Sequence, residues 1–529
     1  MAGAIANELW VPAWARNPRG QVLPGGAAPG GPFDFYISPT GSNANTGTSI
    51  GSPWAITAIN AKQSTYAGKR LGILPGTYDV SGLMGSFHSP ALMINGGLTA
   101  LAPTYIGTAN SSGLYAQGTA TLDAKGASGF FGGSNTTIST VMGQAQGQSG
   151  GPGTPANWGN WTVDGLIFIG FSAWAFQVGS YDGGGGQVPN TAIQNCTFAN
   201  GNGGNNVSVI NNGLHSGPLE LYQYNNCLVS NCWFHDNSTA AGAVDFQHFS
   251  AITVWGGITP GVSTSTGLTL QFNTIVNSGC IYGIPDTGVI GGTTLTGNYI
   301  DSTNAASGTA NPCTVALLGF ANSAAASKGL AGSIFSNNIF RGGVPFDSFA
   351  SEPGSSWSTT CKYFNNTWDL AGGAGFPSAG GIVGHRFFEP SGVSAVLSFY
   401  NNLMYDNGYA GTLSPYGYVV GNVDEFAVSD YNIWGTRNHW TTFSAGSTSA
   451  GQTTRSTLAT WGSAIGGETH SSTNATNPFT NVGIYAGQYT TPSGPAFGTG
   501  RIGGVSGGAA CNVGAWDGTI IKIGCSFAT

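Results

Sequence analysis

The phrase Asn195-Cys-Thr-Phe198 returns in altered form through the middle of the chain. Further copies begin at Asn231, Asn273, Asn298, Asn338, Asn366, Asn402 and Asn432. In each copy an asparagine precedes apolar residues, most of them β-branched or aromatic, and neighbouring copies lie 25 to 42 residues apart. A constant phrase with variable spacing indicates coils of fixed core and variable loops. The sequence therefore predicts a solenoid, in which each coil buries its apolar side chains against its neighbours.

The composition indicates which kind of solenoid this is. Glycine accounts for 88 of the 529 residues, charged residues for 7% and aromatic residues for 12%. Disordered chains are poor in aromatic and β-branched residues, so this composition predicts short strands joined by turns. Helical periodicity is visible only at 56–62. Asparagines at equivalent turns are expected to stack into side-chain amide ladders and to accept a left-handed backbone conformation.

Phrases near both ends of the chain carry a resemblance to a known superfamily. They are Phe35-Tyr-Ile-Ser-Pro-Thr-Gly, Leu74-Pro-Gly-Thr-Tyr78, Gly467-Glu-Thr-His-Ser471, Ser493-Gly-Pro-Ala-Phe497 and Cys511-Asn-Val-Gly-Ala-Trp516. In this order they resemble the opening and closing phrases of the pectate-lyase-like superfamily. The resemblance implies an all-β, right-handed parallel β-helix (a solenoid) with a short N-terminal leader and a small C-terminal cap.

Three regions are expected along the chain: an anchor or linker at 1–32, the parallel β-helix at 33–440, and C-terminal coils and a cap at 441–529. The first region combines Trp10, Trp14, Arg16 and Arg19 with a Pro/Gly-rich tail. Such a segment suits attachment to another protein through a linker, or a cap over the open edge of the first coil. Both interpretations stay open.

The resemblance also implies chemistry that this sequence does not favour. The family's calcium-dependent lyases use clustered aspartates and a basic residue, whereas Glu468, Asn477 and Asn512 stand at three of the family's acidic positions. The whole chain has only 14 Lys and Arg residues. A β-eliminating lyase needs a cation and a base, so a hydrolase is favoured over a calcium-dependent lyase, and no cofactor or metal is expected.

The candidate catalytic residues are Glu220, Asp236, Asp245 and His235, from a polar stretch that also contains His215 and His248. Stacking of neighbouring coils is expected to bring the three acids onto one face. Two carboxylates about 5–9.5 Å apart suit glycoside hydrolysis. The alternative is that these residues are outward-facing and have no catalytic role. A second, thinner set is Asp347, Glu352, Asp369, His385, Arg386 and Glu389.

Aromatic residues in or near the expected loops suggest recognition of sugars. The candidate glycan-binding residues are Trp174, Tyr181, Tyr222, Trp233 and Trp255. Exposed rings can stack on sugars, but aromatic residues are also enriched at interfaces between subunits, and many pack in cores.

The eight cysteines include no C-x-x-C pair. Cys196 and Cys232 occupy the same place in the repeat, which favours small buried thiols in stacked coils over a disulfide. Cys511 and Cys525 are the best disulfide candidates.

Three functions are compatible with the sequence. The favoured one is a virion surface protein (a phage spike, tail fibre or capsid decoration). It is expected to form a homotrimer, to attach to other virion proteins through 1–32 and to bind a polysaccharide. The absence of a recognisable secretory leader supports the virion surface over secretion. The alternatives are a secreted polysaccharide-degrading enzyme and a purely structural decoration protein. The net charge of −7 and the lack of a basic stripe disfavour nucleic acid, and no apolar run suits a membrane span.

Overall fold

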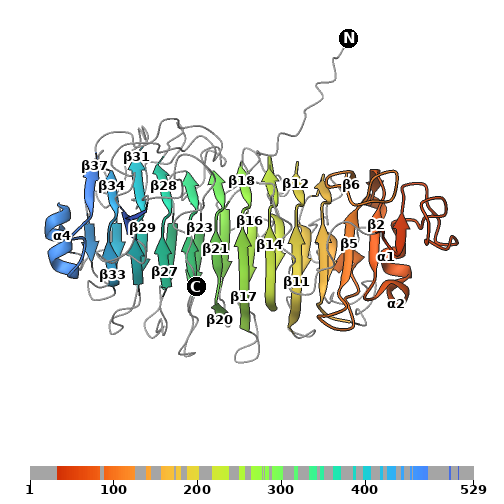
Figure 1. The fold of residues 1–529 in the computed structure, drawn as a ribbon, viewed down its shortest axis with the longest axis horizontal. Helices are drawn as coiled ribbons and strands as arrows, with labels where there is room; N and C mark the ends of the chain where they lie inside the picture. The colour runs from red at the N-terminus through yellow and green to blue at the C-terminus, as the bar shows by residue number, and fades with distance from the viewer. Residues whose placement is uncertain are drawn as a thin grey trace, which may run out of the picture.

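The computed structural model is a rod of stacked coils, which follow one another from the N-terminal end to the C-terminal end (Figure 1). The structure describes residues 32–83, 89–125, 139–144, 157–171, 174–179, 187–201, 217–237, 250–255, 264–276, 278, 280–284, 289–301, 315–319, 333–341, 346–350, 361–370, 385–388, 397–406, 418–420, 426–435, 443–445, 453–455, 457–474, 500–501 and 510–511. Three long sheets run the length of the rod, and they are called sheets A, B and C below.

Sheet A has thirteen strands. They are β1 (Phe35–Ile37), β2 (Arg70–Ile73), β5 (Thr104–Thr108), β8 (Trp161–Asp164), β11 (Val188–Gln194), β14 (Tyr224–Ser230), β17 (Thr264–Gln271), β21 (Thr294–Thr296), β24 (Ile334–Ser336), β27 (Cys361–Phe364), β30 (Leu397–Tyr400) and β33 (Phe426–Asp430), with β20 (Val289–Gly291) pairing to β17.

Sheet B has twelve strands. They are β3 (Gly76–Asp79), β6 (Ala120–Asp123), β9 (Ile167–Ile169), β12 (Thr197–Ala199), β15 (Trp233–His235), β18 (Thr274–Val276), β22 (Tyr299–Asp301), β25 (Ile339–Arg341), β28 (Thr367–Leu370), β31 (Leu403–Asp406), β34 (Ile433–Gly435) and β37 (Ser472–Asn474).

Sheet C also has twelve strands. They are β4 (Ser89–Met93), β7 (Ser139–Gln144), β10 (Trp174–Val178), β13 (Gly217–Leu221), β16 (Ser250–Trp255), β19 (Cys280–Ile284), β23 (Val315–Gly319), β26 (Phe346–Ala350), β29 (His385–Phe388), β32 (Tyr418–Val420), β35 (Phe443–Ala445) and β36 (Thr453–Arg455). Apart from the antiparallel pair β35–β36, the strands of the three sheets pair in parallel.

Each coil contributes one strand to each sheet, as β11, β12 and β13 do before β14 begins the next coil. Inward side chains of successive coils stack: the Phe168 and Phe198 rings lie 5.0 Å apart, and the Phe198 and Phe234 rings 4.8 Å apart, each pair nearly parallel. These rings are fully buried. The predicted right-handed parallel β-helix is confirmed, and its stability comes from contacts between neighbouring coils.

The repeated asparagine phrase forms the short turn between sheets A and B. Two successive positions make this turn, and the first has a left-handed backbone, with φ of 58° at Asn337 and 55° at Asn365. The second position holds Asn338 and Asn366, whose side chains are fully buried. The predicted left-handed asparagines are therefore confirmed at the first position, and the predicted stacked asparagines at the second.

Two copies of the phrase are offset by one residue from the others. Asn231 stands at the left-handed first position, with φ of 52°, and Cys232 stands at the second position, where later coils have asparagine. The same holds for Asn195 and Cys196. The expectation that all eight asparagines are equivalent is wrong, because asparagine suits both positions of the turn and the sequence does not separate them.

The second turn positions form a continuous buried amide ladder. Its members are Asn273, Asn298, Asn338, Asn366, Asn402 and Asn432. Each Nδ2 donates to the Oδ1 of the next asparagine, at 2.9–3.2 Å, and also to a main-chain carbonyl of the previous coil. Each Oδ1 also accepts the backbone N–H of the preceding ladder residue. The ladder therefore satisfies every buried polar atom that it contains.

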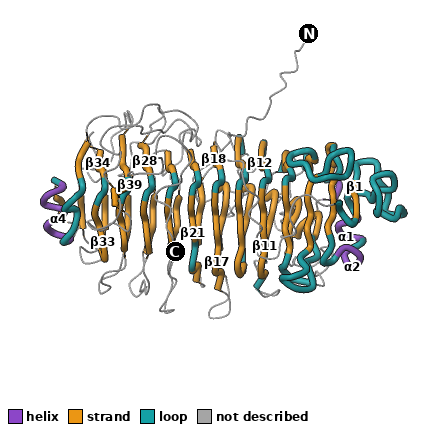
Figure 2. Tube along the Cα trace, in the orientation of Figure 1, coloured by secondary structure: helices purple, strands orange, loops and turns teal. Residues whose placement is uncertain are grey.

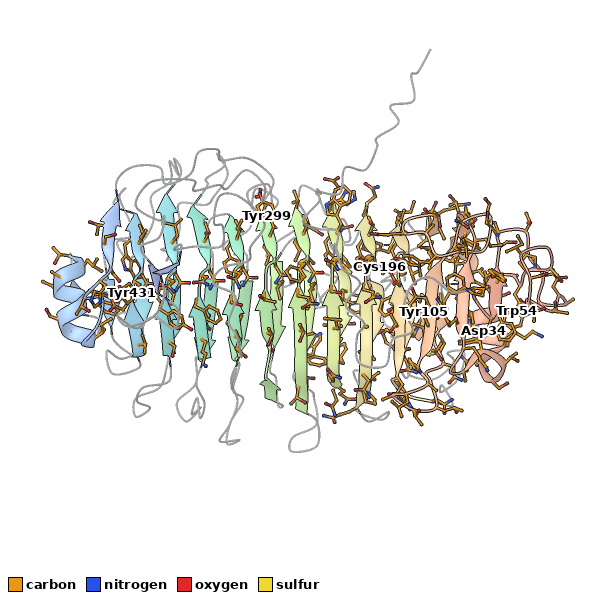
Figure 3. The ribbon with its side chains drawn as sticks, in the orientation of Figure 1. Asp34, Trp54, Tyr105, Cys196, Tyr299 and Tyr431 are labelled. Carbon is orange, nitrogen blue, oxygen red and sulfur yellow. The ribbon has the colours of Figure 1, made fainter. Side chains whose placement is uncertain are left out.

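The two cysteines extend this column towards the N-terminus. The Cys232 thiol contacts the carbonyl of Ile193 at 3.6 Å, in the place where Asn273 donates to Val229. Cys196 lies near the middle of the rod (Figure 3). Both thiols are free and buried, so the predicted buried thiols are confirmed for Cys196 and Cys232.

Short helices cover the two ends of the coil stack (Figure 2). At the N-terminal end, α1 (Ala58–Ala61) and α2 (Gln63–Tyr66) bury Ile59 and Tyr66, close to the predicted helical segment 56–62. At the other end, α4 (Leu458–Ile465) buries Trp461. Helix α4 was not predicted, although Thr457 caps its first turn by accepting from Thr460 N and Gly466 ends it in a left-handed conformation.

Several expectations lie outside the described residues. They concern residues 1–31 of the expected leader and Cys525, the proposed disulfide partner of Cys511. The described antiparallel pair near the C-terminus joins β38 (Gly500–Arg501) to β39 (Ala510–Cys511).

Candidate functional site

Glu220 and Asp236, two of the predicted catalytic acids, lie on different sheets. Glu220 is in β13 of sheet C, whereas Asp236 directly follows β15 of sheet B. The chain passes through β14 of sheet A between them, so the two side chains belong to different sides of the rod. The prediction that stacking brings them onto one face is therefore wrong. Asp245, His215 and His248 lie outside the described residues.

Trp233, His235 and Asp236 form one cluster on the outer face of sheet B, called the surface cluster below. The rings of Trp233 and His235 stack with centroids 3.8 Å apart and planes 27° apart. Asp236 Oδ2 lies 2.9 Å from Nδ1 of His235. Phe234, between the two rings in sequence, is fully buried in the core, so strand alternation turns Trp233 and His235 outward.

The surface cluster is accessible to a ligand. Trp233 is half-buried, and the Asp236 side chain is 53% exposed. Asp236 has a left-handed φ of 52°, which ends the strand and leaves its carboxylate beside the imidazole. An aromatic pair with a carboxylate beside it can contact the apolar face of a sugar and accept hydrogen bonds from its hydroxyls.

Glu220, Tyr222 and Trp255 form a second cluster on sheet C, called the buried cluster below. The Tyr222 hydroxyl donates to Glu220 Oε1 at 2.7 Å, and Trp255 Nε1 donates to the same oxygen at 3.2 Å. The two rings stack in parallel with centroids 5.2 Å apart. Glu220 is fully buried. Burial raises the pKa of Glu220 well above its ordinary value, and the hydrogen bonds from Tyr222 and Trp255 offset this only in part.

The predicted glycan-binding aromatics separate into two groups. Trp174, Tyr222 and Trp255 are buried, whereas Trp233 is half-buried. The predicted glycan-binding role needs an exposed ring, so it does not fit Trp174, Tyr222 and Trp255 as the structure places them. Tyr181 lies outside the described residues.

The second predicted set is also divided between sheets. Asp347 of β26 and Arg386 of β29 are register partners in sheet C, and His385 pairs with Phe346. Asp369 belongs to β28 in sheet B. Glu352 and Glu389 lie outside the described residues.

Two further buried carboxylates, those of Asp164 and Glu468, have structural roles. Asp164 accepts hydrogen bonds from the hydroxyls of Tyr105 and Tyr115 and from the amides of Gln194 and Asn195. These hydrogen bonds hold the four donor side chains together on the outer face of sheet A, near the N-terminal end, where Figure 3 labels Tyr105.

Glu468, which the sequence marked only as a departure from the family's acidic position, ends the amide ladder. It accepts from Asn432 Nδ2, from Trp434 Nε1 and, at 2.5 Å, from Ser429 Oγ. Glu468 is left-handed, with φ of 58°. Burial raises its pKa, and these hydrogen bonds oppose the rise.

Among the described residues no three His, Cys, Asp or Glu side chains gather as they would around a metal ion. None of the helices in the described part of the chain is long and apolar enough to cross a bilayer.

No protein-family model matches the chain, and no curated protein matches it either. Solved structures with a similar architecture include a rhamnogalacturonan lyase, which is 15% identical with a TM-score of 0.44 over 72% of this chain and 83% of that chain. Pectate lyase Pel9A is 14% identical, with a TM-score of 0.41 over 72% and 77% of the two chains. PfbA, a surface adhesin of Streptococcus pneumoniae, is 12% identical, with a TM-score of 0.41 over 74% and 85%. The fold assignment rests on the pairing of the three sheets, and these similarities transfer no residue roles.

Proposed function

We propose that this β-helix protein binds a glycan on the outer face of sheet B, through the surface cluster. The observation that carries the proposal is the half-buried Trp233 stacked on His235, with the exposed Asp236 carboxylate beside them. The stacked rings supply an apolar contact, and the carboxylate accepts hydrogen bonds from sugar hydroxyls. Uncharged surroundings suit this role, because only 7% of the chain is charged.

Replacing Trp233 by alanine is expected to weaken glycan binding at least about tenfold, because truncating a central aromatic contact commonly costs more than about 1.4 kcal/mol. Binding is measured by screening the purified chain on a glycan array and titrating the best ligand by calorimetry. Asp236→Asn should also weaken binding. Asp79→Asn is its matched control, since Asp79 lies on the same sheet with a side chain 50% exposed. Unchanged affinity in Trp233→Ala, or equal losses in the two asparagine variants, would reject the surface cluster as the binding site.

Display on a virion surface, as a homotrimer attached to other virion proteins through 1–32, belongs to the same proposal. A surface poor in Lys and Arg suits close contact between identical copies, since few like charges have to be brought together. Light scattering of the purified chain should give a mass near three times 53.7 kDa. A monomer at micromolar concentration would contradict the trimer.

The alternative of a secreted polysaccharide-degrading enzyme is less well supported by the described residues. Of its three predicted acids, Glu220 and Asp236 are divided between two sheets, and Asp245 lies outside the described residues. Glycan binding needs only the surface cluster, whereas hydrolysis needs two carboxyl groups on opposite sides of one bond.

A further inference from the structure

Two bulky aromatic residues adopt a backbone conformation that asparagine or glycine adopts in other coils. Phe272 and Tyr431 both have φ of 56° at the first position of the turn between sheets A and B. Other coils place asparagine at this position, as at Asn231 and Asn337, or glycine, as at Gly297. A positive φ is an outlier for a bulky residue, because its Cβ atom crowds the following carbonyl oxygen. Each of the two aromatic residues therefore destabilises its own turn.

Tyr431 has a structural reason for its conformation. Its ring stacks on the ring of His470, with centroids 4.7 Å apart and planes 4° apart. Asp430 accepts hydrogen bonds from the backbone N–H groups of both residues. These contacts join the last coils near the C-terminal end of the rod, where Figure 3 labels Tyr431. The position of the ring in this stack explains why the strained turn holds a tyrosine.

Phe272 has no comparable packing role in the part of the chain that the structure describes. Its side chain is half-buried, and it belongs neither to the apolar core nor to the partly buried side chains that pack against that core. Backbone strain gathers at binding sites, where it presents a side chain to a ligand. A strained aromatic residue outside the core therefore indicates a ligand contact.

Phe272 lies beside the surface cluster. It takes the turn position that Asn231 takes one coil earlier. Two residues further along the chain, Thr274 and Trp233 are register partners in β18 and β15. Phe272 thus stands one coil across and two residues along from Trp233, which corresponds to about 8 Å between the Cα atoms. Both rings can contact one oligosaccharide at this separation.

The residues around the two rings restrict the ligand to an uncharged glycan. Small side chains flank Trp233, because its register partners are Thr197 of β12 and Thr274 of β18. The described segments around it contain no Lys or Arg; they are 187–201, 217–237 and 264–276. The Asp236 side chain is 53% exposed, so its carboxylate repels an anionic sugar.

We propose that Phe272 and Trp233 form a two-ring platform for an uncharged oligosaccharide, in which each ring contacts a different sugar unit. The apolar faces of the sugar units pack on the rings, and Asp236 accepts a hydrogen bond from a hydroxyl. The inference rests on the proposed function, since it uses the same surface cluster. It adds the ligand class and a contact on the neighbouring coil, and it predicts that a single sugar unit cannot use both rings.

Calorimetric titration of the full chain with cellotetraose, chitotetraose and tetragalacturonate tests the ligand class. We expect one of the two neutral tetrasaccharides to bind more tightly than tetragalacturonate. The corresponding monosaccharide should bind at least about tenfold more weakly than that tetrasaccharide, because it reaches only one ring. Tighter binding of tetragalacturonate, binding of none of the three, or equal affinity for the monosaccharide would overturn the proposal.

The variant Phe272→Asn separates a binding role from a packing role. It removes the ring and relieves the strained turn, so it should weaken binding of the neutral tetrasaccharide at least about fivefold without lowering the midpoint of thermal unfolding. Phe272→Tyr retains an aromatic ring and should bind within about twofold of the wild type. A lower unfolding midpoint with unchanged affinity in Phe272→Asn would show that the ring only packs, and would overturn the proposal.

Tyr431→Asn is the matched control, because it makes the same change at the same turn position, five coils further along sheet A. It loses the stack on His470, so it should lower the unfolding midpoint and leave the affinity unchanged. If Trp233→Ala weakens binding of the tetrasaccharide and Phe272→Asn does not, the proposed function stands and the two-ring platform is rejected. If both variants retain the wild-type affinity, the surface cluster and the platform are rejected together.

Discussion

Replacing Asn366 by leucine is expected to lower the free energy of unfolding by about 3–5 kcal/mol, more than any surface substitution in this chain. Asn366 stands in the middle of the buried amide ladder. Its loss leaves the Asn338 backbone N–H and one Asn338 amide hydrogen without an acceptor, and it leaves the carbonyl of Phe335 without the amide that donates to it. Each buried polar group that loses its partner costs about 1–3 kcal/mol. Urea unfolding followed by circular dichroism measures the change.

A second, exposed amide ladder supplies the control. Asn190 of β11 donates to Asn160, which precedes β8, and accepts from Asn226 of β14, with 2.9 Å between the bonded atoms in both cases. Water replaces these hydrogen bonds, and glycine accepts the left-handed φ of 52° at this position, so Asn190→Gly should cost less than about 1 kcal/mol. Equal losses in Asn366→Leu and Asn190→Gly would show that burial of the ladder contributes nothing to stability.

Replacing Glu468 by leucine is the other substitution with a large expected effect, again about 3–5 kcal/mol. The change removes the acceptor of three buried donors, Asn432 Nδ2, Trp434 Nε1 and Ser429 Oγ. The damage should begin at the C-terminal cap, where α4 and Trp461 close the stack. Hydrogen exchange followed by mass spectrometry should show lost protection in 426–474 before it shows any change in the first coils. Uniform loss of protection along the whole rod would contradict a local role.

The buried carboxyl of Glu468 also predicts how stability depends on pH. Burial raises its pKa in the folded chain above the value of about 4.3 expected when unfolded. The stabilisation that goes with the protonated form is lost as the pH rises through the folded pKa, so the free energy of unfolding should increase as the pH falls through that pKa. Glu468→Gln should remove this slope, and an unchanged slope in that variant would assign it to another group.

Asp430 acts in the opposite direction at lower pH. Burial raises the pKa of this carboxyl, but hydrogen bonds from His470 and Tyr431 outweigh burial and lower it. The stabilisation from ionised Asp430 is therefore present above about pH 3.9 and lost as the pH falls through its folded pKa. The two carboxyls lie at the same end of the rod, where Figure 3 labels Tyr431. The C-terminal cap should thus be most stable in mildly acidic solution.

The sequence was sufficient for the fold because asparagine recurs at the repeated turn. The second position holds a buried asparagine in six coils, whereas the left-handed first position also holds Phe272, Gly297 and Tyr431. Asparagine fits both positions, so the phrase is visible even where the loops differ. The same versatility caused the one-residue error at Asn195 and Asn231, since an asparagine at the first position looks like an asparagine at the second. Helix α4 was not predicted, because its helical periodicity extends over only eight residues, although Thr457 and Gly466 cap its two ends.

The candidate site was harder to predict, because it depends on the path of the chain between the repeated turns. Glu220 and Asp236 are close in sequence, yet a complete strand of sheet A separates them. Trp233, His235 and Asp236 lie close together because they fall within four consecutive residues, in β15 and directly after it.

The direction of the amide ladder limits how the rod can be lengthened. Every amide passes its hydrogen bond towards the C-terminus, and Glu468 accepts from Asn432 without an amide of its own to continue the series, so the ladder ends there. A duplicated coil inserted between Asn338 and Asn366 would find a donor on one side and an acceptor on the other. The same coil inserted after Glu468 would meet neither. Engineered rods of chosen length are therefore expected to tolerate insertion or deletion of whole coils within the ladder, while the terminal carboxylate stays in place.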